Sequence, residues 1–349
     1  MRVFVVGDAQ SPHTRRWVTM YTDAGDDVMV AGFGVWSDLD AGFTSLGEAA
    51  LSARRYAVAV PRLRRAIRAF HPDVVNALFV SSYGVATALA RPSAPLVLGA
   101  WGSDVLWLPR RSRWHRKAIR WALDRAALVT YDSDDVQRAV VAAVPTARTL
   151  RVVFGPESSW LDGEPAAGKR ILSPRALDPF YGIGTIVEAF SMARRNGLDW
   201  DLDILTYGMD HSELTAAVHA LGINDAVRFH GRLDRKDVRD LFGECEVFCS
   251  VPSSDATAAT LLEGMAAGSF PVVSDLPATY EWIQDGLNGL IVPHDNSRLL
   301  AEALGRACSD EHLRKDAARR NRALIQEQAT WERSATIARR EIGRLAAKA

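Results

Sequence analysis

Two acidic residues eight positions apart, Asp255 and Glu263, give this chain its clearest chemical signal. They lie in the segment 253–268, which reads SSDATAATLLEGMAAG. A helix that begins near Ala258 places Glu263 two turns into the helix and Asp255 in the loop before it. The free N–H groups and the positive dipole end of such a helix point toward that loop and would hold an anion such as a phosphate. With a carboxylate on either side to accept hydrogen bonds from sugar hydroxyls, the segment has the chemistry expected of a nucleotide-sugar site.

An ordinary structural explanation of the same residues remains open. Leu261, Leu262 and Met265 give the helix an apolar face for a core, and Asp255 would serve as a loop or cap residue. The flanking segments favour the functional interpretation, because 246–252 and 268–275 read as buried strands on either side of the helix. The acidic loop then follows the carboxyl end of a strand, where open parallel sheets bind their ligands.

The order of predicted elements indicates an α/β protein with two Rossmann-like domains. In the first half, strands are expected at 3–6, 27–31, 74–77, 96–99 and 128–131, and helices at 14–23, 52–70, 83–90 and 113–126. In the second half, strands are expected at 170–173, 201–207, 226–230, 247–251, 270–274 and 289–292, and helices at 183–194, 212–221, 235–245 and 296–307. Such alternation predicts parallel sheets with helices on both faces.

Linker chemistry and length set the expected domains. The segment 162–168 is rich in Gly and Pro, so we expect an N-terminal acceptor-binding domain at 1–165 and a C-terminal nucleotide-sugar-binding domain at 166–330. A long polar helix from about 310 closes the chain, and its last part, 331–349, is expected to cross back onto the first domain. The 349 residues suffice for two domains that each bury a core.

Charge is balanced overall but concentrated locally. Segment 61–125 holds 12 basic residues against three acidic ones. Its basic residues cluster in two predicted helices, together with three tryptophans: Arg62, Arg64, Arg65, Arg68, Arg110, Arg111, Arg113, Arg116, Lys117, Arg120, Trp107, Trp114 and Trp121. This mixture suits an anionic membrane surface or a lipid-linked acceptor, although solvated helices with the tryptophans in the core would also explain it. Nucleic acid is not an expected partner, because no groove-reading or single-strand module is present.

Cysteine usage and hydropathy indicate a cytoplasmic protein, which the basic segment could bring to the inner membrane face. The three cysteines lack paired CxxC spacing, so buried free thiols are expected in place of a zinc site. The N-terminus has too short an apolar run for a signal peptide, and no run of about 18 apolar residues occurs.

Together, the acidic loop, the helix and the strand pattern resemble the retaining glycosyltransferases of family 4. That family has the GT-B fold, two facing Rossmann-like domains with the active site in the cleft. The likeness is strong over 170–305 and looser over 1–160. The family motif is a Glu pair, so Asp255 matches its first position with a shorter side chain. The resemblance implies that Asp255 contacts the transferred sugar, that Glu263 binds the nucleotide ribose, and that the amides of Ala259 and Thr260 hold phosphate.

Further site residues follow from the same resemblance. Arg175, shortly after the first strand of the second domain, would bind the donor diphosphate bidentately and stabilise the departing charge. Where the family usually has Lys-Gly, this chain has Tyr181-Gly182, so one phosphate-binding cation is missing. Arg232 and Leu233 are expected to line the base pocket.

In the first domain, Trp101, a candidate for acceptor binding, stands where the family commonly has a histidine, in a Trp-Gly-Ser-Asp turn that some members share. Asp104 becomes a candidate for sugar contact and catalysis, and Ser103 for acceptor binding, with helix capping as an equal alternative for both. His13 and Arg16 are candidates for acceptor binding, although a capped helix with its tryptophan in the core explains that segment almost as well.

The resemblance implies a metal-independent hexosyltransferase without a cofactor, with a UDP- or GDP-linked sugar as donor and a glycan, a lipid or a small molecule as acceptor. Asp201 and Asp203 superficially resemble a metal-binding pair, but they enter a strand, and we assign them no metal role. An oxidoreductase is disfavoured because no GxGxxG follows the first strand. A catalytically weak nucleotide- or glycan-binding interaction protein remains the main alternative, and a sugar-nucleotide epimerase a weaker one.

Overall fold

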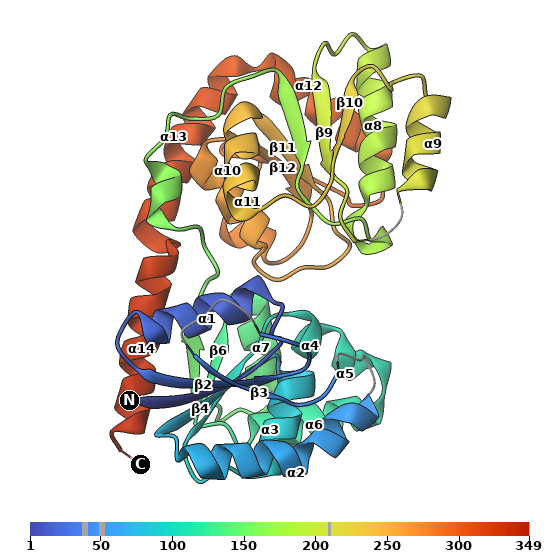
Figure 1. Cartoon of the computed structure of the whole chain (residues 1–349). Coiled ribbons are helices and arrows are strands. Elements are labelled where there is room, and N and C mark those ends of the chain that lie inside the picture. The colour runs from blue at the N-terminus through green and yellow to red at the C-terminus, as the bar shows by residue number, and fades with distance from the viewer. Residues whose placement is uncertain (37–40, 49–52, 209–210, 349) are drawn as a thin grey trace. The chain divides into compact units, whose positions relative to one another are not determined.

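The computed structural model describes residues 1–36, 41–48, 53–208 and 211–348. Two compact units make up the chain. One contains Met1–Val153 together with Glu332–Ala349, and the other contains Phe154–Trp331. Each unit is built on a parallel sheet with helices on both faces (Figure 1). The α/β fold class predicted from the sequence is therefore confirmed.

The first unit contains a seven-stranded parallel sheet in the order β3-β2-β1-β4-β5-β6-β7. Its strands are β1 (Arg2–Val6), β2 (Asp27–Gly32), β3 (Gly42–Ser45), β4 (Val74–Leu78), β5 (Leu96–Gly99), β6 (Leu128–Tyr131) and β7 (Thr149–Arg151). Its helices are α1 (Pro12–Thr22), α2 (Ala53–Phe70), α3 (Val85–Ala90), α4 (Ser103–Leu106), α5 (Leu108–Arg111), α6 (Arg113–Leu123), α7 (Asp134–Ala143) and α14 (Trp331–Ala346). Residue 52, the expected start of α2, lies outside the described residues.

The second unit contains a six-stranded parallel sheet in the order β10-β9-β8-β11-β12-β13. Its strands are β8 (Arg170–Ser173), β9 (Asp201–Leu205), β10 (Val227–His230), β11 (Val247–Ser250), β12 (Phe270–Ser274) and β13 (Leu290–Val292). Its helices are α8 (Ile183–Arg195), α9 (Ser212–Ala220), α10 (Arg235–Glu244), α11 (Ala259–Ala267), α12 (Ser297–Ser309) and α13 (Glu311–Gln328). All six predicted strands of this half are present.

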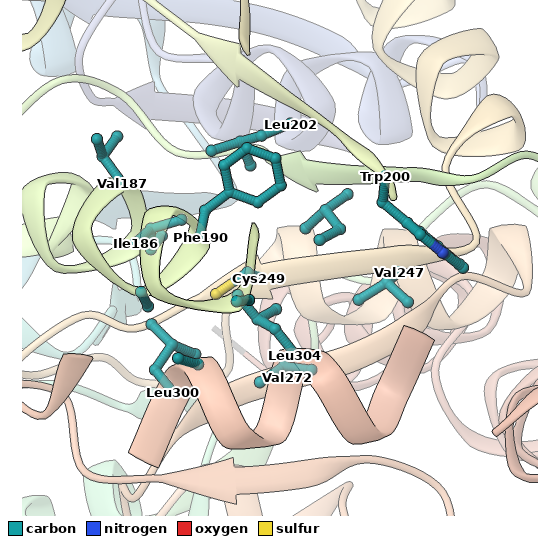
Figure 2. Packing of buried hydrophobic residues seen from close by; sticks show 14 of the residues in the cluster. Ile186, Val187, Phe190, Trp200, Leu202, Val247, Cys249, Val272, Leu300 and Leu304 are labelled. Carbon is teal, nitrogen blue, oxygen red and sulfur yellow. The ribbon is translucent and has the colours of Figure 1, made fainter. Parts of the chain in front are cut away.

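Side chains of the second sheet alternate between two apolar layers, because successive strand residues point to opposite faces. Cys249 on β11 and Val272 on β12 face α8 and α12, where they meet buried Phe190 and Leu304 (Figure 2). Phe248, between Val247 and Cys249, points to the other face, toward α11. Burial on both faces explains why these strands are almost wholly apolar.

The boundary between the units lies at 153/154, and our expected boundary at 165/166 was wrong. Residues that follow Val153 contact the rest of the second unit. Phe154 stacks on Trp331, with ring centroids 5.8 Å apart, and the Trp160 ring lies 5.9 Å from that of Phe242. Gly155 crosses so close to the backbone of Ala329 that a Cβ would lie 1.5 Å from the carbonyl oxygen. The Gly- and Pro-rich composition of 162–168 predicted a linker there. Composition does not reveal the contacts of Phe154, Gly155 and Trp160, which set the boundary earlier.

The expected continuous helix from 310 is also interrupted. It ends at Gln328 and restarts at Trp331, and the helix after this break, α14, belongs to the first unit from Glu332 onward. Arg339 on α14 holds both oxygens of the buried Asp26 carboxylate, each at 3.0 Å. Arg148 pairs with Glu341 at 3.0 Å. These two ion pairs attach α14 to the first unit next to its sheet.

The cysteine expectation is confirmed. Cys245, Cys249 and Cys308 are buried and free. Burial raises the pKa of all three thiols, that of Cys308 to about 12, so the thiolate is disfavoured at neutral pH. They act as small apolar core residues.

Candidate functional site

The loop before α11 and the start of that helix form the centre of the candidate site. Ala258 takes an extended N-cap conformation, and α11 begins at Ala259, within one residue of the predicted start. Its N-cap side chain, a methyl group, accepts no hydrogen bond from the first-turn amides. The helix lies close against β11 because Gly264 faces Phe248, whose ring atoms would be 2.4 Å from a Cβ. This contact sets where Glu263, the neighbouring residue, is held.

Arg175 joins three residues that the sequence places far apart. The loop after β8 carries it, and its Nη2 donates to Asp255 Oδ2 at 2.9 Å while Nη1 donates to Thr260 Oγ1 at 3.0 Å. The guanidinium also lies over the Tyr181 ring, 4.1 Å from the centroid. The structure thus brings Arg175, Asp255, Thr260 and Tyr181 together at the carboxyl edge of the second sheet.

The electrostatics of this cluster reflect its burial. Desolvation raises the pKa of the Asp255 carboxyl, and the Arg175 charge opposes that shift. For Arg175, burial alone would lower the pKa of the guanidinium, but the Asp255 charge together with Tyr181 and Tyr207 outweighs burial, so the pKa is raised. The geometry of the two groups is that of a partly buried ion pair, with 2.9 Å between Arg175 Nη2 and Asp255 Oδ2.

Glu263 is paired with a second arginine that sequence reasoning missed. Its side chain is 8% exposed, and Arg235 Nη1 donates to its Oε1 at 2.9 Å. Arg235 also donates from Nε to Glu157 Oε2 at 3.0 Å. Nothing in the local sequence marked either residue. The one available signal was the position of Arg235 just after a strand end, beside the expected base pocket.

Tyr207 is another site residue without a sequence prediction. It follows β9 at the same edge, and its carbonyl accepts a hydrogen bond from Leu177 N at 2.8 Å. Burial raises the pKa of its hydroxyl, and the charges of Arg175, Glu263 and Arg232 also act on it. The hydroxyl therefore lies among the residues assigned to the diphosphate, the ribose and the base.

Arg232 and Leu233 occupy the turn between β10 and α10, at the same carboxyl edge. Arg232 is exposed and Leu233 half-buried. In the described part of the chain, the Arg232 guanidinium forms no ion pair. Arg232 and Leu233 thus lie where a base pocket was expected, and the exposed Arg232 guanidinium is accessible to a ligand.

In the first unit, the structure brings His13 and Trp101 into contact, with ring centroids 5.5 Å apart. Phe79, at the end of β4, adds a third ring 6.2 Å from Trp101, and it adopts a positive φ of 78°. A non-glycine residue in that region is strained, and such strain concentrates at functional sites. Arg16 lies partly buried on α1, and Trp17 beside it is fully buried.

Asp104 is not exposed to a substrate, which corrects its expected catalytic role. The residue is fully buried, and its two oxygens accept hydrogen bonds from Val80 N at 2.8 Å and Trp101 N at 3.0 Å. Burial raises the pKa of this carboxyl to about 6, and the amide hydrogen bonds oppose the shift. Asp104 ties together the loops after β4 and β5. Ser103 is exposed, and it is the first residue of α4, whose cap is Gly102.

A cavity of about 1080 Å³ in the second unit lies away from this cluster. Lys169, Trp200 and Glu246, which line it, immediately precede β8, β9 and β11, so it opens at the amino edge of the sheet. Parallel sheets bind ligands at the opposite edge. Its buried cation, Arg314, donates hydrogen bonds to Glu246 and to two backbone carbonyls. We therefore do not regard this cavity as the donor site.

Asp203 has an ordinary structural role. Arg170 holds both of its oxygens, at 2.7 and 2.6 Å, and His230 Nε2 lies 2.6 Å from Oδ1. Among the residues that the structure describes, no group of three or more His, Cys, Asp or Glu is arranged to hold a metal ion.

Comparisons with known proteins identify relatives of this chain. Residues 159–324 match the family model described as glycosyl transferases group 1, and residues 2–133 match the model described as glycosyl transferase 4-like. The chain is 33% identical over 178 residues to an exopolysaccharide phosphotransferase of Streptomyces coelicolor, a match over 50% of this chain and 18% of that protein. It is 31% identical over 146 residues to a phosphatidyl-myo-inositol mannosyltransferase of Mycobacterium tuberculosis, over 41% of this chain and 38% of that protein.

Among solved structures, HepE of Anabaena in complex with UDP and glucose superposes with a TM-score of 0.81. The two chains share 17% identity, and the match covers 98% of this chain and 99% of the other. At that identity the likeness shows the fold. The chain spans less than two fifths of the length of the two curated relatives named above.

Proposed function

This chain belongs to the family 4 glycosyltransferases of the GT-B fold, and from that premise we propose that it is a retaining enzyme. It transfers a sugar from a UDP- or GDP-linked donor to a hydroxyl group of an acceptor. The observation that carries the proposal is the Arg175–Asp255–Thr260 cluster at the N-terminus of α11. The complex of HepE with UDP and glucose supports a nucleotide sugar as the donor.

Each part of the donor has a proposed partner in the second unit. Arg175 and the amides of Ala259 and Thr260 hold the diphosphate, because a guanidinium and a helix N-terminus both favour anions. Asp255 exchanges its bond to Arg175 for hydroxyl groups of the transferred sugar. Glu263 accepts hydrogen bonds from the ribose, and the turn at Arg232 and Leu233 contacts the base.

The proposed reaction needs no nucleophile from the protein. The bond from the sugar C1 to the diphosphate oxygen breaks while the acceptor oxygen bonds C1 on the same face. The acceptor hydroxyl proton passes to the departing diphosphate. What the protein supplies is stabilisation of the developing negative charge, from Arg175 and the two helix amides. We propose that this charge stabilisation takes the place of a metal ion.

Calorimetric titration with UDP, GDP and ADP, with and without magnesium, tests the donor assignment. We expect the wild-type chain to bind one of them selectively, without dependence on magnesium. Glu263→Gln should weaken binding about tenfold, since it removes a charged acceptor. Glu302→Gln is the control, because Glu302 is an exposed residue of α12 that pairs with the exposed Arg298. Absence of binding by the wild type would refute the proposal.

Tyr181 supports a second candidate function. Its ring stacks on Arg175 at a position where a cation would otherwise face the donor phosphates. A site with one fewer cation would bind a nucleotide sugar and turn it over slowly, as a nucleotide- or glycan-binding interaction protein would. Release of nucleotide from a sugar donor in the presence of acceptor, abolished by Arg175→Gln, would exclude that candidate.

The acceptor is proposed to be reached at an anionic membrane surface. Trp107 and Trp114 are 48% and 66% exposed, so the alternative that placed them in the core was wrong. Arg111 lies 4.6 Å from the Trp107 ring, and Lys117 lies 5.6 Å from the Trp114 ring. Cations beside exposed indoles suit the headgroup region of anionic lipids and a lipid-linked acceptor.

Vesicle sedimentation tests this membrane contact. No helix in the described segments has the length and apolar character of a membrane span. We expect binding to vesicles with anionic lipid and not to neutral vesicles. Trp114→Ala should weaken it, and equal binding to both kinds of vesicle would contradict the proposal.

A further inference from the structure

The carboxylate of Glu263, which is proposed to bind the ribose, is held by the guanidinium of Arg235. Arg235 has no part in the proposed reaction. Arg235, the first residue of α10, reaches Glu263 Oε1 at 2.9 Å. Because the Glu263 side chain is 8% exposed, an unpartnered charge there would be costly. Arg235 supplies the compensating charge at hydrogen-bond distance.

The pairing engages only one carboxylate oxygen. Within the described residues, Oε2 of Glu263 accepts no hydrogen bond. A carboxylate fixed through Oε1 presents Oε2 in a defined direction, and an acceptor that is already ordered binds a ligand with a smaller entropic cost. A pair of vicinal hydroxyls is the kind of donor that one oriented carboxylate oxygen accepts.

Arg235 is itself fixed from a second direction. Its Nε donates to Glu157 Oε2 at 3.0 Å, and its guanidinium lies 5.7 Å from the centre of the Trp160 ring. Both of these residues belong to the segment that opens the second unit. A planar guanidinium bound on two edges cannot rotate freely, which distinguishes it from a lysine in the same place.

We propose that Arg235 is a positioning residue for the ribose of the nucleotide donor, holding Glu263 by one oxygen so that the other faces the ribose hydroxyls, while Glu157 orients Arg235. The inference rests on the proposed function, because it takes Glu263 as the ribose acceptor. Arg235 acts through Glu263 and need not touch the ligand.

The test compares a ribonucleotide with its 2′,3′-dideoxy analogue, using the full chain and whichever of UDP, GDP or ADP the wild type binds. Arg235→Ala should weaken binding of the ribonucleotide about tenfold, which is the size of effect expected for a charge-assisted hydrogen bond. The same variant should bind the dideoxy analogue as the wild type does. The affinity of Arg235→Lys for the ribonucleotide should fall between those of the wild type and Arg235→Ala. Lysine keeps the positive charge but lacks the planar guanidinium that binds on two edges.

Two further variants separate positioning from a general loss of structure. Lys236→Ala removes a neighbouring cation that is 73% exposed and paired with Asp240, and it should leave both affinities unchanged. In the double variant Arg235→Ala/Glu263→Gln, the loss should not exceed that of Glu263→Gln alone, since both changes remove the same interaction. In a transfer assay, Arg235→Ala should raise KM for the donor and leave kcat near its wild-type value.

The outcomes separate the inference from the function on which it depends. Equal loss for the ribonucleotide and its dideoxy analogue, or unchanged affinity in Arg235→Ala, would overturn the role of Arg235 and leave the glycosyltransferase proposal standing. If the wild type binds none of the three nucleotides, the proposed function fails and the inference fails with it.

Discussion

Single residues decide how much positive charge the donor site carries. Arg175 is paired with Asp255, and the position that resemblance assigns to a lysine holds Tyr181, stacked on that arginine. Two observations escaped sequence reasoning at this scale. Asp104 looked accessible because nothing in a sequence distinguishes a buried carboxylate from an exposed one. Arg235 looked unremarkable because its partners, Glu157 and Glu263, are 78 and 28 positions away.

Tyr181→Lys should strengthen nucleoside diphosphate binding several-fold. A lysine amine would replace a neutral ring with a cation beside Arg175, and phosphate groups would gain a second charge partner. The gain should shrink as salt increases, because the added attraction is screened. Titration at low and high salt measures both effects. Tyr181→Phe, which keeps the stacking ring and adds no charge, is the control and should show no such salt dependence.

Asp104→Asn should remove a pH dependence of folding stability. The pKa of Asp104 is about 6 in the folded chain, against an ordinary value of 3.8. Protonation therefore favours the folded state, so the contribution of this group is greatest below about pH 4 and is lost as the pH rises through 6. The difference in unfolding free energy between the wild type and Asp104→Asn should fall by about 2 kcal/mol between pH 4 and 7. Urea unfolding at several pH values measures it, and a flat difference would contradict the assignment.

Helices and strands fix the site by packing, and most of them could be foreseen. Apolar runs bounded by Gly, Pro and Asp are reliable in this chain, so the six strands of the second sheet lie within two residues of their expected bounds. The strands β3 and β7 escaped prediction because they are three to four residues long and only half-buried. The helix α7 was also missed, although Val136 and Val140 give it a buried stripe. At the break at 329–330, the backbone of Ala329 crosses that of Gly155, a contact that no local pattern reveals.

Gly264→Ala tests whether the close packing of α11 against β11 determines the position of Glu263. A Cβ there would lie 2.4 Å from the ring of Phe248, which is fully buried and has no room to move aside. We expect destabilisation of about 2 kcal/mol, the usual cost of overpacking, and weaker nucleotide binding as Glu263 is displaced.

Gly305→Ala is the matched control for that substitution. This glycine lies within α12, and a Cβ on it would meet no atom within 4 Å. Alanine should stabilise the chain there by up to about 1 kcal/mol, because it favours the helix. Urea unfolding and nucleotide titration of the two variants measure the contrast. Equal effects would show that the contact with Phe248 does not matter.

At the scale of the whole chain, α14 connects the end of the sequence to the first unit through charge. Asp26 has a side chain that is 1% exposed, and Arg339 binds both of its oxygens. A partner at this position matters more than an exposed one, because removing it leaves a buried carboxylate less well compensated.

Arg339→Met should destabilise the first unit by about 1 kcal/mol, a value reduced because the arginine is itself 40% exposed. It should also make α14 more sensitive to limited proteolysis. Arg340→Met is the control, because that arginine is 60% exposed and its pair with Glu341, at 3.5 Å, is long and weak. Identical proteolysis of both variants would show that Arg339 does not fasten the helix.

The stacked pair Phe154 and Trp331 has a consequence for how this chain is assembled. These residues are the first and the last of the second unit, and a hydrogen bond from Trp331 N to Pro156 O at 2.9 Å reinforces their contact. In topological terms the second unit is an insertion, nested between β7 and α14 of its host. An inserted module whose ends meet can be excised or transplanted without spanning a gap, and a short linker could rejoin the host.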